Sequence, residues 1–242
     1  MVKAMMGVGG GLQPQVYTPL RDEVLHTLRQ ALLGGSFVVG ERIIEADLAE
    51  RLGVSRGTLR EAIRHLEEEG LVVTSPHRGT FVVDPSHDEI RDIYGLRMAL
   101  ESYAAEQAAR RITPTELDAL QSVADDFNAL ASTGRAALAP RLGLDLQFHQ
   151  SICEAGGNPR LLRTWIGLCA PLRLLLSAYV EPYMNSGEVV DQHQHVIDAL
   201  RAGDGAAARA ILIDHLIDSR DSMLETITKR ATSANTPGSL RA

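Results

Sequence analysis

Two polar side chains interrupt an apolar helical pattern between residues 138 and 156. Asp145 and His149 fall on the same stripe as Leu142 and Ile152, at steps of three and four residues, so both are expected to face inward. A carboxylate and an imidazole one turn apart can bind one divalent metal from a single helix. Two ligands do not complete such a site, and the plainer alternative is a hydrogen-bonded pair in the core.

Two further histidines lie near the C-terminal end of the chain. His193 shares an inward apolar stripe, whereas His195 lies about 200° around the helix and is expected to face water. His193 precedes a turn at Gly203 by ten residues and His215 follows it by twelve, so in an antiparallel pair of helices both lie roughly 15–18 Å from that turn. Each could be an ordinary core histidine, but together the inward groups predict a metal site of Asp145, His149, His193 and His215.

An arginine also falls on an inward stripe, in the segment IRDIYGLRMALE. Arg97 precedes Glu101 by one turn, so the simplest expectation is an ion pair between them. The functional alternative is that the Arg97 guanidinium binds the carboxylate of a small acid in a bidentate manner. Trp165, Tyr179 and Tyr183 are expected to pack in the core rather than line a cavity.

Three histidines and one aspartate could also hold a catalytic metal. A metal that keeps a water ligand can lower the pKa of that water towards 7, so the alternative function is a metal-dependent hydrolase or lyase. The sequence offers no convincing general acid or base to accompany such a metal. A choice between the two functions depends on the rest of the chain.

The composition indicates a soluble globular protein large enough for one or two domains. The chain has 242 residues, of which 45% are hydrophobic, and a formal net charge of −7. That charge argues against indiscriminate coating of nucleic acid, although a local basic stripe remains compatible with it. No signal peptide is apparent, and no apolar run approaches the roughly 20 residues of a membrane helix. The expected location is the cytoplasm, without a membrane partner.

Helix and turn signals divide the chain into two folded parts. Residues 1–15 and 231–242 are rich in small and polar residues and are expected to be disordered tails. Residues 16–84 predict three helices followed by a β-hairpin, a winged helix-turn-helix. Residues 85–230 predict an all-helical antiparallel bundle of about six helices, beginning where Ser86 and Glu89 form a capping-box pattern. The expected fold class is therefore mainly α.

The second helix of the helix-turn-helix carries a stripe of arginines. Ser55 is placed to cap this helix, and Arg56, Arg60 and Arg64 follow at four-residue steps along one face. Guanidinium groups on a helix in the major groove can bind guanine edges or phosphates. The turn SPHRG adds His77 and Arg78 at the predicted tip of the wing.

The alternative for such a stripe is a solvated surface in which the arginines pair with neighbouring acidic residues. The candidates for pairing are Glu61, Glu67, Glu68 and Glu69. The short turn between the two helices, the arginines at the start of the second helix and the wing favour DNA binding instead.

The segment LAERLGVSRGTLREAIRHLEEEGLV followed by RGTFV resembles the winged helix-turn-helix of the GntR family of bacterial transcriptional regulators. The resemblance covers roughly residues 18–83 and implies base or phosphate contacts by Arg56 and Arg60, supporting contacts by Ser55 and Thr58, and a wing tip at Gly79. Gly57-Thr58 replaces the Thr-Pro of many members, and Ala46 replaces an arginine of some. The DNA-binding residues expected from spacing and resemblance together are Ser55, Arg56, Thr58, Arg60, Arg64, His77, Arg78 and Gly79.

The C-terminal part resembles the FCD effector domain of the FadR subfamily, through DLQFH, HQHVIDALRAGD and DHL. The number of expected helices makes it more similar to the shorter, VanR-like form. The resemblance implies that one Asp and three His bind a divalent metal beside a ligand cavity, with zinc as the first expectation and nickel or manganese as alternatives. Of His193 and His195, the resemblance aligns His193 with a metal-binding histidine of the family. The resemblance also implies that Arg97 helps to bind an acidic effector.

These observations predict a ligand-responsive transcriptional regulator rather than an enzyme. A homodimer would read palindromic operator DNA, and a small organic or sugar acid bound beside the metal would change the operator affinity, with a repressor as the expected role. A third class, a constitutive architectural DNA-binding protein, would not need buried polar ligands in its helical domain.

Overall fold

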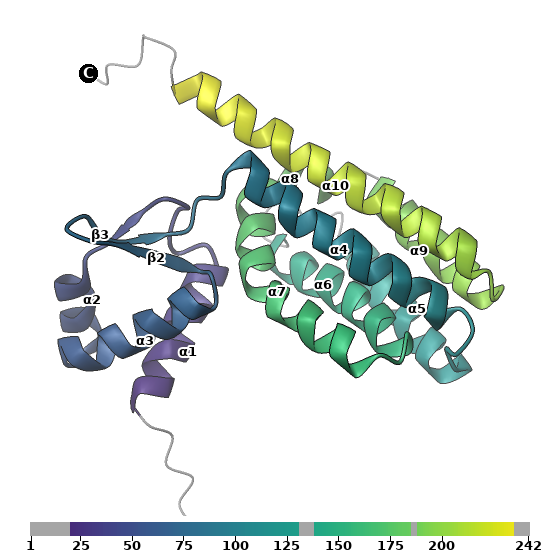
Figure 1. Ribbon diagram of the computed structural model, residues 1–242, viewed down its shortest axis with the longest axis horizontal. Helices are drawn as coiled ribbons and strands as arrows, with labels where there is room; N and C mark the ends of the chain where they lie inside the picture. Colours follow the sequence, from purple (N-terminus) through teal and green to yellow (C-terminus); the bar gives the residue numbers. More distant parts are fainter. Residues whose placement is uncertain (1–19, 131–137, 185–187, 235–242) are drawn as a thin grey trace, which may run out of the picture.

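The computed structural model describes residues 20–130, 138–184 and 188–234, which form two domains (Figure 1). The predicted tails at 1–15 and from 235 onward lie outside these residues. The N-terminal domain consists of α1 (Leu20–Leu33), β1 (Arg42–Ile43), α2 (Glu45–Leu52), α3 (Arg56–Glu68), β2 (Val72–Ser75) and β3 (Gly79–Val82).

The helix-turn-helix forms where the sequence predicts it. Helix α2 ends at Gly53, whose φ of 66° places it in the left-handed region that glycine adopts without a steric cost. Ser55 then caps α3, because its hydroxyl accepts a hydrogen bond from the Thr58 backbone N–H at 3.1 Å. Leu59 and Leu66 of α3 are fully buried against the other helices of the domain. The opposite face of α3 therefore remains open to solvent.

The wing contains one strand more than the sequence predicts. Strand β3 lies in the middle of an antiparallel sheet of order β1-β3-β2, and Phe81 of β3 pairs with both Arg42 and Val73. The prediction of a two-stranded hairpin was incomplete because β1 has only two residues, too few to show an alternating pattern. This extra pairing anchors the wing to the segment that leads into α2.

The C-terminal domain is a helical bundle whose first helix starts directly after Ser86. Ser86 and Glu89 form both hydrogen bonds of a capping box at the start of its first helix. Among the described residues, six long helices and the one-turn α8 follow one another. They are α4 (His87–Ala108), α5 (Pro114–Ala129), α6 (Leu138–Ala155), α7 (Pro159–Tyr179), α8 (Glu181–Met184), α9 (Glu188–Arg201) and α10 (Gly205–Ala234).

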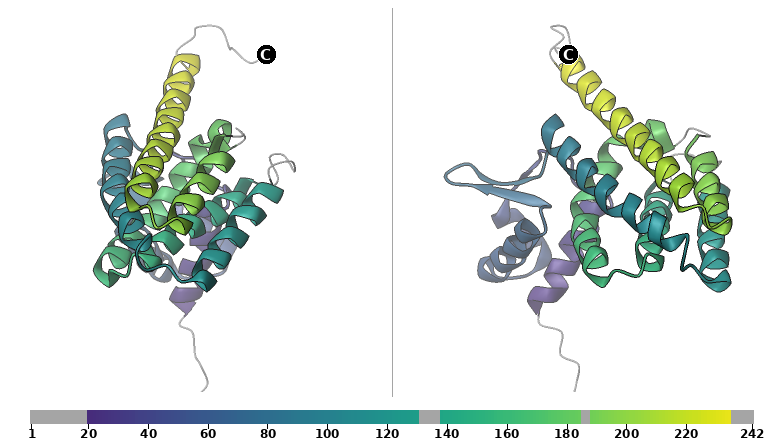
Figure 2. Two further views of the ribbon diagram at one scale, coloured as in Figure 1. Left: turned by 90° about the vertical axis from the view of Figure 1, so that its right-hand side faces the viewer. Right: turned by 45° about the vertical axis from the view of Figure 1, so that its right-hand side comes forward.

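Two long helices organise the bundle. Helix α10 runs along α4 for most of the length of α4, and the turn at Gly203 returns the chain from α9 into α10 (Figures 1 and 2). Helix α6 packs between α4, α5 and α7. Helix α10 continues to Ala234, so residues 231–234 are helical and the predicted start of the C-terminal tail at residue 231 is too early.

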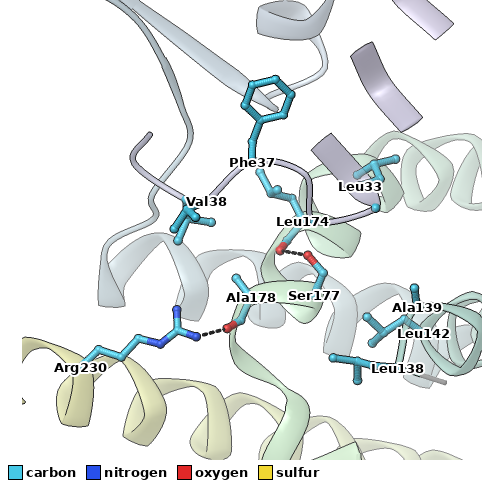
Figure 3. A pocket seen from close by; sticks show the side chains of 13 residues that line it. Leu33, Phe37, Val38, Leu138, Ala139, Leu142, Leu174, Ser177, Ala178 and Arg230 are labelled. Carbon is cyan, nitrogen blue, oxygen red and sulfur yellow. Dashed lines mark hydrogen bonds between the residues drawn. The ribbon is translucent and has the colours of Figure 1, made fainter. Parts of the chain in front are cut away.

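The two domains meet mainly at α7. Leu174 of α7 packs in the core of the N-terminal domain, whereas its neighbours Leu175 and Leu176 belong to the core of the bundle. A cavity of about 400 Å³ lies beside this contact, lined by Phe37 and Val38 from the N-terminal domain and by residues of α6, α7 and α10 (Figure 3). The start of α6 and the end of α7 are thus in contact with the space between the domains.

Helix α7 is also long and apolar enough to cross a membrane when length and composition alone are considered. The expectation from the sequence was that no segment approaches this length. Helix α7 contains three arginines and packs against α1, α4, α6 and α10, and a single core helix of a globular protein meets the same criteria. One such helix is weak evidence for a membrane span.

Candidate metal centre and nucleic-acid interface

The four predicted metal ligands converge at one point inside the bundle. Asp145 and His149 come from α6, His193 from α9 and His215 from α10. One potential ligand atom from each lies within 4.8 Å of the others, and all four side chains are buried. The one-turn spacing on α6 and the turn at Gly203 bring them to the same height in the bundle, as the sequence argument required.

The distances within this cluster are those expected around a metal ion. The Nε2 atoms of His149 and His215 are 3.1 Å apart, and Asp145 Oδ1 lies 3.5 Å from His193 Nε2 and 3.9 Å from His149 Nε2. Ligands bound at about 2.0–2.2 Å around a tetrahedral metal lie roughly 3.3–3.5 Å from one another. The four residues therefore need only small shifts to share one ion.

The hydrogen bonding of the imidazoles provides a test of that fit. The His193 ring is buried, yet its Nδ1 has no hydrogen-bond partner among the described residues, and its Nε2 has only the 3.5 Å contact with Asp145 Oδ1, at the outer limit of a hydrogen bond. The Nε2 atoms of His149 and His215 face each other, so at most one of the two can donate to the other. Unpaired buried nitrogens are costly, and a shared cation would satisfy all three rings at once. Three imidazoles and one carboxylate are a donor set suited to zinc or another divalent transition metal.

Polar neighbours orient two of the imidazoles towards the centre of the cluster. Glu101 Oε2 lies 2.6 Å from His149 Nδ1, on the side of the ring away from the cluster. His215 Nδ1 lies 2.9 Å from the Tyr183 hydroxyl and 3.0 Å from Gln192 Oε1. Such partners fix the tautomer of a metal-binding histidine, leaving Nε2 free to bind the ion. The sequence did not reveal these roles of Glu101, Tyr183 and Gln192, because they depend on contacts between distant helices.

The protonation states also suit metal binding. Burial alone would raise the pKa of Glu101, but the Arg97 guanidinium and His149 lower it to about 2, so this carboxylate is ionised. Burial lowers the pKa of His193, and that of His215 falls well below 6.5, with His193 and His149 adding to the effect. Both imidazoles are therefore neutral near pH 7, which is the form that binds metals.

Arg97 forms the ion pair expected from its spacing and keeps one guanidinium nitrogen without a described partner. Its Nε donates a hydrogen bond to Glu101 Oε1 at 2.7 Å, so the expected one-turn ion pair is present. Trp165 Nε1 donates to the same oxygen at 2.8 Å. The Arg97 NH2 group, however, is buried without a hydrogen-bond partner among the described residues. Arg97 is therefore held in place by Glu101 and still has a donor available to a ligand.

Histidine 195 provides a contrast within the same helix. Its side chain is exposed, whereas His193 two residues earlier is buried in the cluster. This difference confirms the facing derived from helical periodicity, and it supplies a matched position for experiments.

The predicted DNA-binding arginines lie on the open face of α3. Arg56, Arg60 and Arg64 are all exposed. Arg60 pairs with Glu45 of α2 at 2.8 Å, while Arg56 and Arg64 make no hydrogen bond or ion pair to other described residues. Three of the four acidic residues considered as alternative partners have other contacts: Glu69 with Arg29, Glu68 with His65 and Glu67 with the backbone of Thr74. No ion pair joins the fourth, Glu61, to an arginine among the described residues. The described contacts therefore leave this stripe largely uncompensated.

The wing presents a second set of polar groups beside α3. His77 is exposed with a φ of 64°, an uncommon value outside glycine, and Arg78 is exposed next to it. Gly79 has a φ of 102°, and the Arg42 guanidinium lies against it, within 3.4 Å of where a Cβ would be. Arg42 was missed in the sequence, because its position beside the wing depends on the two-residue strand β1. It adds a cation near the wing tip.

Comparison with known families finds a match for each of the two domains. Residues 92–218 match the FCD domain, and residues 20–82 match the gntR family of bacterial regulatory proteins. The chain belongs to the GntR family.

Two named regulators align with most of the length of this GntR-family protein. It is 32% identical to the "Putative L-lactate dehydrogenase operon regulatory protein" of Escherichia coli (strain K12), with 87% of each chain aligned. It is 29% identical to the "Nta operon transcriptional regulator" of Aminobacter aminovorans, over 84% of this chain and 94% of the relative. A GntR regulator from Rhodococcus sp. RHA1 has the same fold, with a TM-score of 0.73, 25% identity and coverage of 86% of this chain and 99% of the other. The family consists of transcriptional regulators and not enzymes, so the hydrolase or lyase alternative is set aside.

Proposed function

We propose that this GntR-family protein is a ligand-responsive repressor whose operator affinity is changed by a small organic or sugar acid bound beside a divalent metal. The observation that carries the proposal is the convergence of Asp145, His149, His193 and His215 in a buried site beside the unpaired NH2 group of Arg97. The relatives support it through their names, which refer to an L-lactate dehydrogenase operon and to a D-xylose utilization operon transcriptional repressor.

Zinc is the metal that best fits the donor set, with nickel or manganese as alternatives. When bound, the ion supplies a Lewis-acidic position for an oxygen of the ligand. The protein does the rest: Glu101 orients His149, Tyr183 and Gln192 orient His215, and Arg97 offers an N–H donor to the carboxylate of the acid.

The structure of the bundle offers a route from this site to the DNA-binding domain. Helix α6 carries Asp145 and His149, and its first turn and a half lines the cavity between the domains through Leu138 and Leu142. Helix α7 packs against α6 and inserts Leu174 into the core of the N-terminal domain. A ligand that favours one arrangement of α6 would therefore also favour one placement of the recognition helix α3.

Two copies of the chain are proposed to bind a palindromic operator from the cytoplasm. Leu96 and Tyr103 lie two turns apart on α4, Ile166 lies on α7, which packs against α4, and all three are about half exposed. Large exposed apolar side chains on adjacent helices are suited to a dimer interface. Contacts to DNA are assigned to α3 and its cap through Ser55, Arg56, Thr58, Arg60 and Arg64, and to the wing through His77, Arg78 and Gly79.

The test compares His193→Ala with His195→Ala, two substitutions of the same kind on the same helix. Metal content is measured by mass spectrometry after purification with zinc, and operator affinity is measured by fluorescence anisotropy on a duplex selected from a random-sequence pool. The wild type and His195→Ala are expected to hold one zinc per chain and to melt at a lower temperature after chelation, since an ion that binds only the folded state stabilises it. His193→Ala is expected to lose the metal and the response to chelator. Equal metal content in all three proteins would refute the site.

The effector is then sought among small acids added to the zinc-loaded protein. An acid that binds at this site is expected to raise the melting temperature of the wild type and to change its affinity for the selected duplex. Arg97→Gln is expected to reduce both effects. The effector proposal fails if no acid alters duplex affinity, or if Arg97→Gln responds as the wild type does.

A further inference from the structure

A second arginine lies buried beside the proposed metal centre. Arg141 is on α6, one turn before Asp145, and only 2% of it is exposed. Its NH1 donates a hydrogen bond to the Met184 carbonyl, and its guanidinium lies over the Phe127 ring at 4.3 Å from the ring centre. Its Nε and NH2 atoms are buried without any hydrogen-bond partner among the described residues. A buried guanidinium with two unused nitrogens is costly unless a ligand completes it.

Arg141 and Arg97 are linked to the metal cluster through different neighbours. The Phe127 ring, against which Arg141 packs, lies 5.0 Å from the His193 ring. Arg97 instead pairs with Glu101, the residue that orients His149. One guanidinium is therefore connected to His193 through Phe127, and the other to His149 through Glu101. Each has at least one unpartnered nitrogen.

The charges around the cluster indicate what a ligand must carry. Among the described residues of the bundle, the buried side chains of formal charge are Arg97, Arg141, Glu101 and Asp145, and their charges sum to zero when the three histidines bind the ion as neutral imidazoles. A divalent ion would leave this buried site with two uncompensated positive charges. Uncompensated charge in a low-dielectric interior is strongly unfavourable. A ligand with two negative charges restores neutrality, and a monocarboxylate does not.

We propose that the effector is a dicarboxylate, with one carboxylate beside the metal and Arg97 and the other on Arg141. This inference rests on the proposed function, because it names the chemical class of acid for the same site. The Nε and NH2 atoms of a guanidinium form the fork that binds a carboxylate through two parallel hydrogen bonds, and these are the two Arg141 nitrogens without partners. Phe127 and the Met184 carbonyl hold the guanidinium in place for this contact.

The experiment measures the binding of matched acids to the zinc-loaded protein by isothermal titration calorimetry. Each pair differs only by a methyl group in place of the second carboxylate: malonate and propionate, succinate and butyrate, malate and 2-hydroxybutyrate, glutarate and pentanoate. In at least one pair the diacid is expected to bind the wild type about ten- to a hundredfold more tightly, as two hydrogen bonds to a charged group imply. Arg141→Gln is expected to bring this ratio close to one. Arg141→Lys, which keeps the charge but lacks the fork, should give an intermediate ratio.

The matched control is Arg209→Gln, which removes an exposed guanidinium from α10 and is expected to leave the diacid preference as in the wild type. The inference is overturned if the wild type shows no diacid preference, or if Arg141→Gln weakens diacid and monoacid by the same factor, since both point to a structural anchor only. If Arg141→Gln fails to fold, the wild-type ratio and Arg141→Lys decide the question. A wild type that binds neither zinc nor any acid refutes the proposed function itself, whereas zinc and monoacid binding without a diacid preference refutes the dicarboxylate alone.

Discussion

The two domains place the same side-chain type in opposite surroundings. Arg56 and Arg64 on α3 are exposed and without described partners, whereas Arg97 and Arg141 in the bundle are 1–2% exposed and fixed by neighbours. An exposed guanidinium is solvated and can neutralise any phosphate of a DNA backbone that comes within reach. A buried guanidinium is stable only when a nearby negative charge compensates it, so it binds only ligands of suitable charge and position. The first arrangement suits a long polyanion, and the second suits a small acid of defined charge.

The same contrast predicts how the two regions respond to substitution. Residues on the open face of α3 contribute little to folding, so changes there should alter DNA affinity with almost no effect on stability. The polar cluster of the bundle lies in the core, so changes there should alter stability and ligand binding together. Three measurements test this difference between the two regions.

The largest effect is expected for Glu101→Gln. This substitution removes the charge that pairs with Arg97 and faces His149, so it leaves a buried guanidinium without its carboxylate. Breaking a buried ion pair from one side costs about 3–5 kcal/mol of unfolding free energy. Urea denaturation in the presence of a chelator measures this loss without the contribution of the metal.

Glu106→Gln is the matched control on the same helix. The Glu106 side chain is 30% exposed and pairs with Arg110 and Arg209 near the surface, so its loss should cost at most about 1 kcal/mol. If the two variants lost equal stability, the buried charge network would not be a structural feature of this domain.

The second effect concerns acidification of the metal-free protein. The folded bundle lowers the pKa of His193 and His215 from 6.5, so the unfolded chain takes up these protons more readily. The stability that depends on the neutral imidazoles is present above pH 6.5 and is lost as the pH falls below it. Two such imidazoles remove up to about 3 kcal/mol between pH 7.5 and 5.5.

Chemical denaturation at each pH, with chelator present, measures the slope of the unfolding free energy against pH. His193→Ala should reduce it, whereas His195→Ala should not, because His195 is exposed. Zinc affinity should fall in the same direction, since the ligands must be deprotonated to bind the ion. A wild-type stability independent of pH over this range would contradict the buried, neutral cluster.

Much of the candidate site could be predicted because its signals are periodic. The steps of three and four residues place Asp145, His149 and His193 on inward faces, and the turn at Gly203 sets His193 and His215 level. The caps at Ser55 and Ser86 are likewise local patterns, and both hydrogen bonds are present. In each case the facing of a side chain, or its role as a cap, depends only on residues nearby in the sequence.

The parts that escaped prediction depend on contacts between distant segments. Strand β1 exists because β3 pairs with it, and Arg42 reaches the wing only through that pairing. Tyr183 and Gln192 approach His215 from helices whose relative placement no sequence pattern specifies. Arg141 had a signal, its one-turn spacing from Asp145, but an arginine at the edge of an apolar stripe is more often solvated. Its burial follows from the packing of Phe127 and α8 around it.

The smallest effect on folding is expected for Arg56→Ala and Arg60→Ala. These two substitutions test the role of the exposed arginines on α3 directly. Both should weaken binding to a selected duplex while leaving urea unfolding essentially unchanged, and Arg56→Ala should cost about tenfold in affinity. Arg60→Ala should cost less, because Glu45 already neutralises part of the Arg60 charge in the free protein. Glu45→Gln removes that carboxylate, so in its background the two arginine substitutions should become equal. Fluorescence anisotropy at several salt concentrations gives each value. If Arg60→Ala were the more damaging in both backgrounds, Arg60 would act as a selective contact to a base edge rather than as a counterion to phosphate.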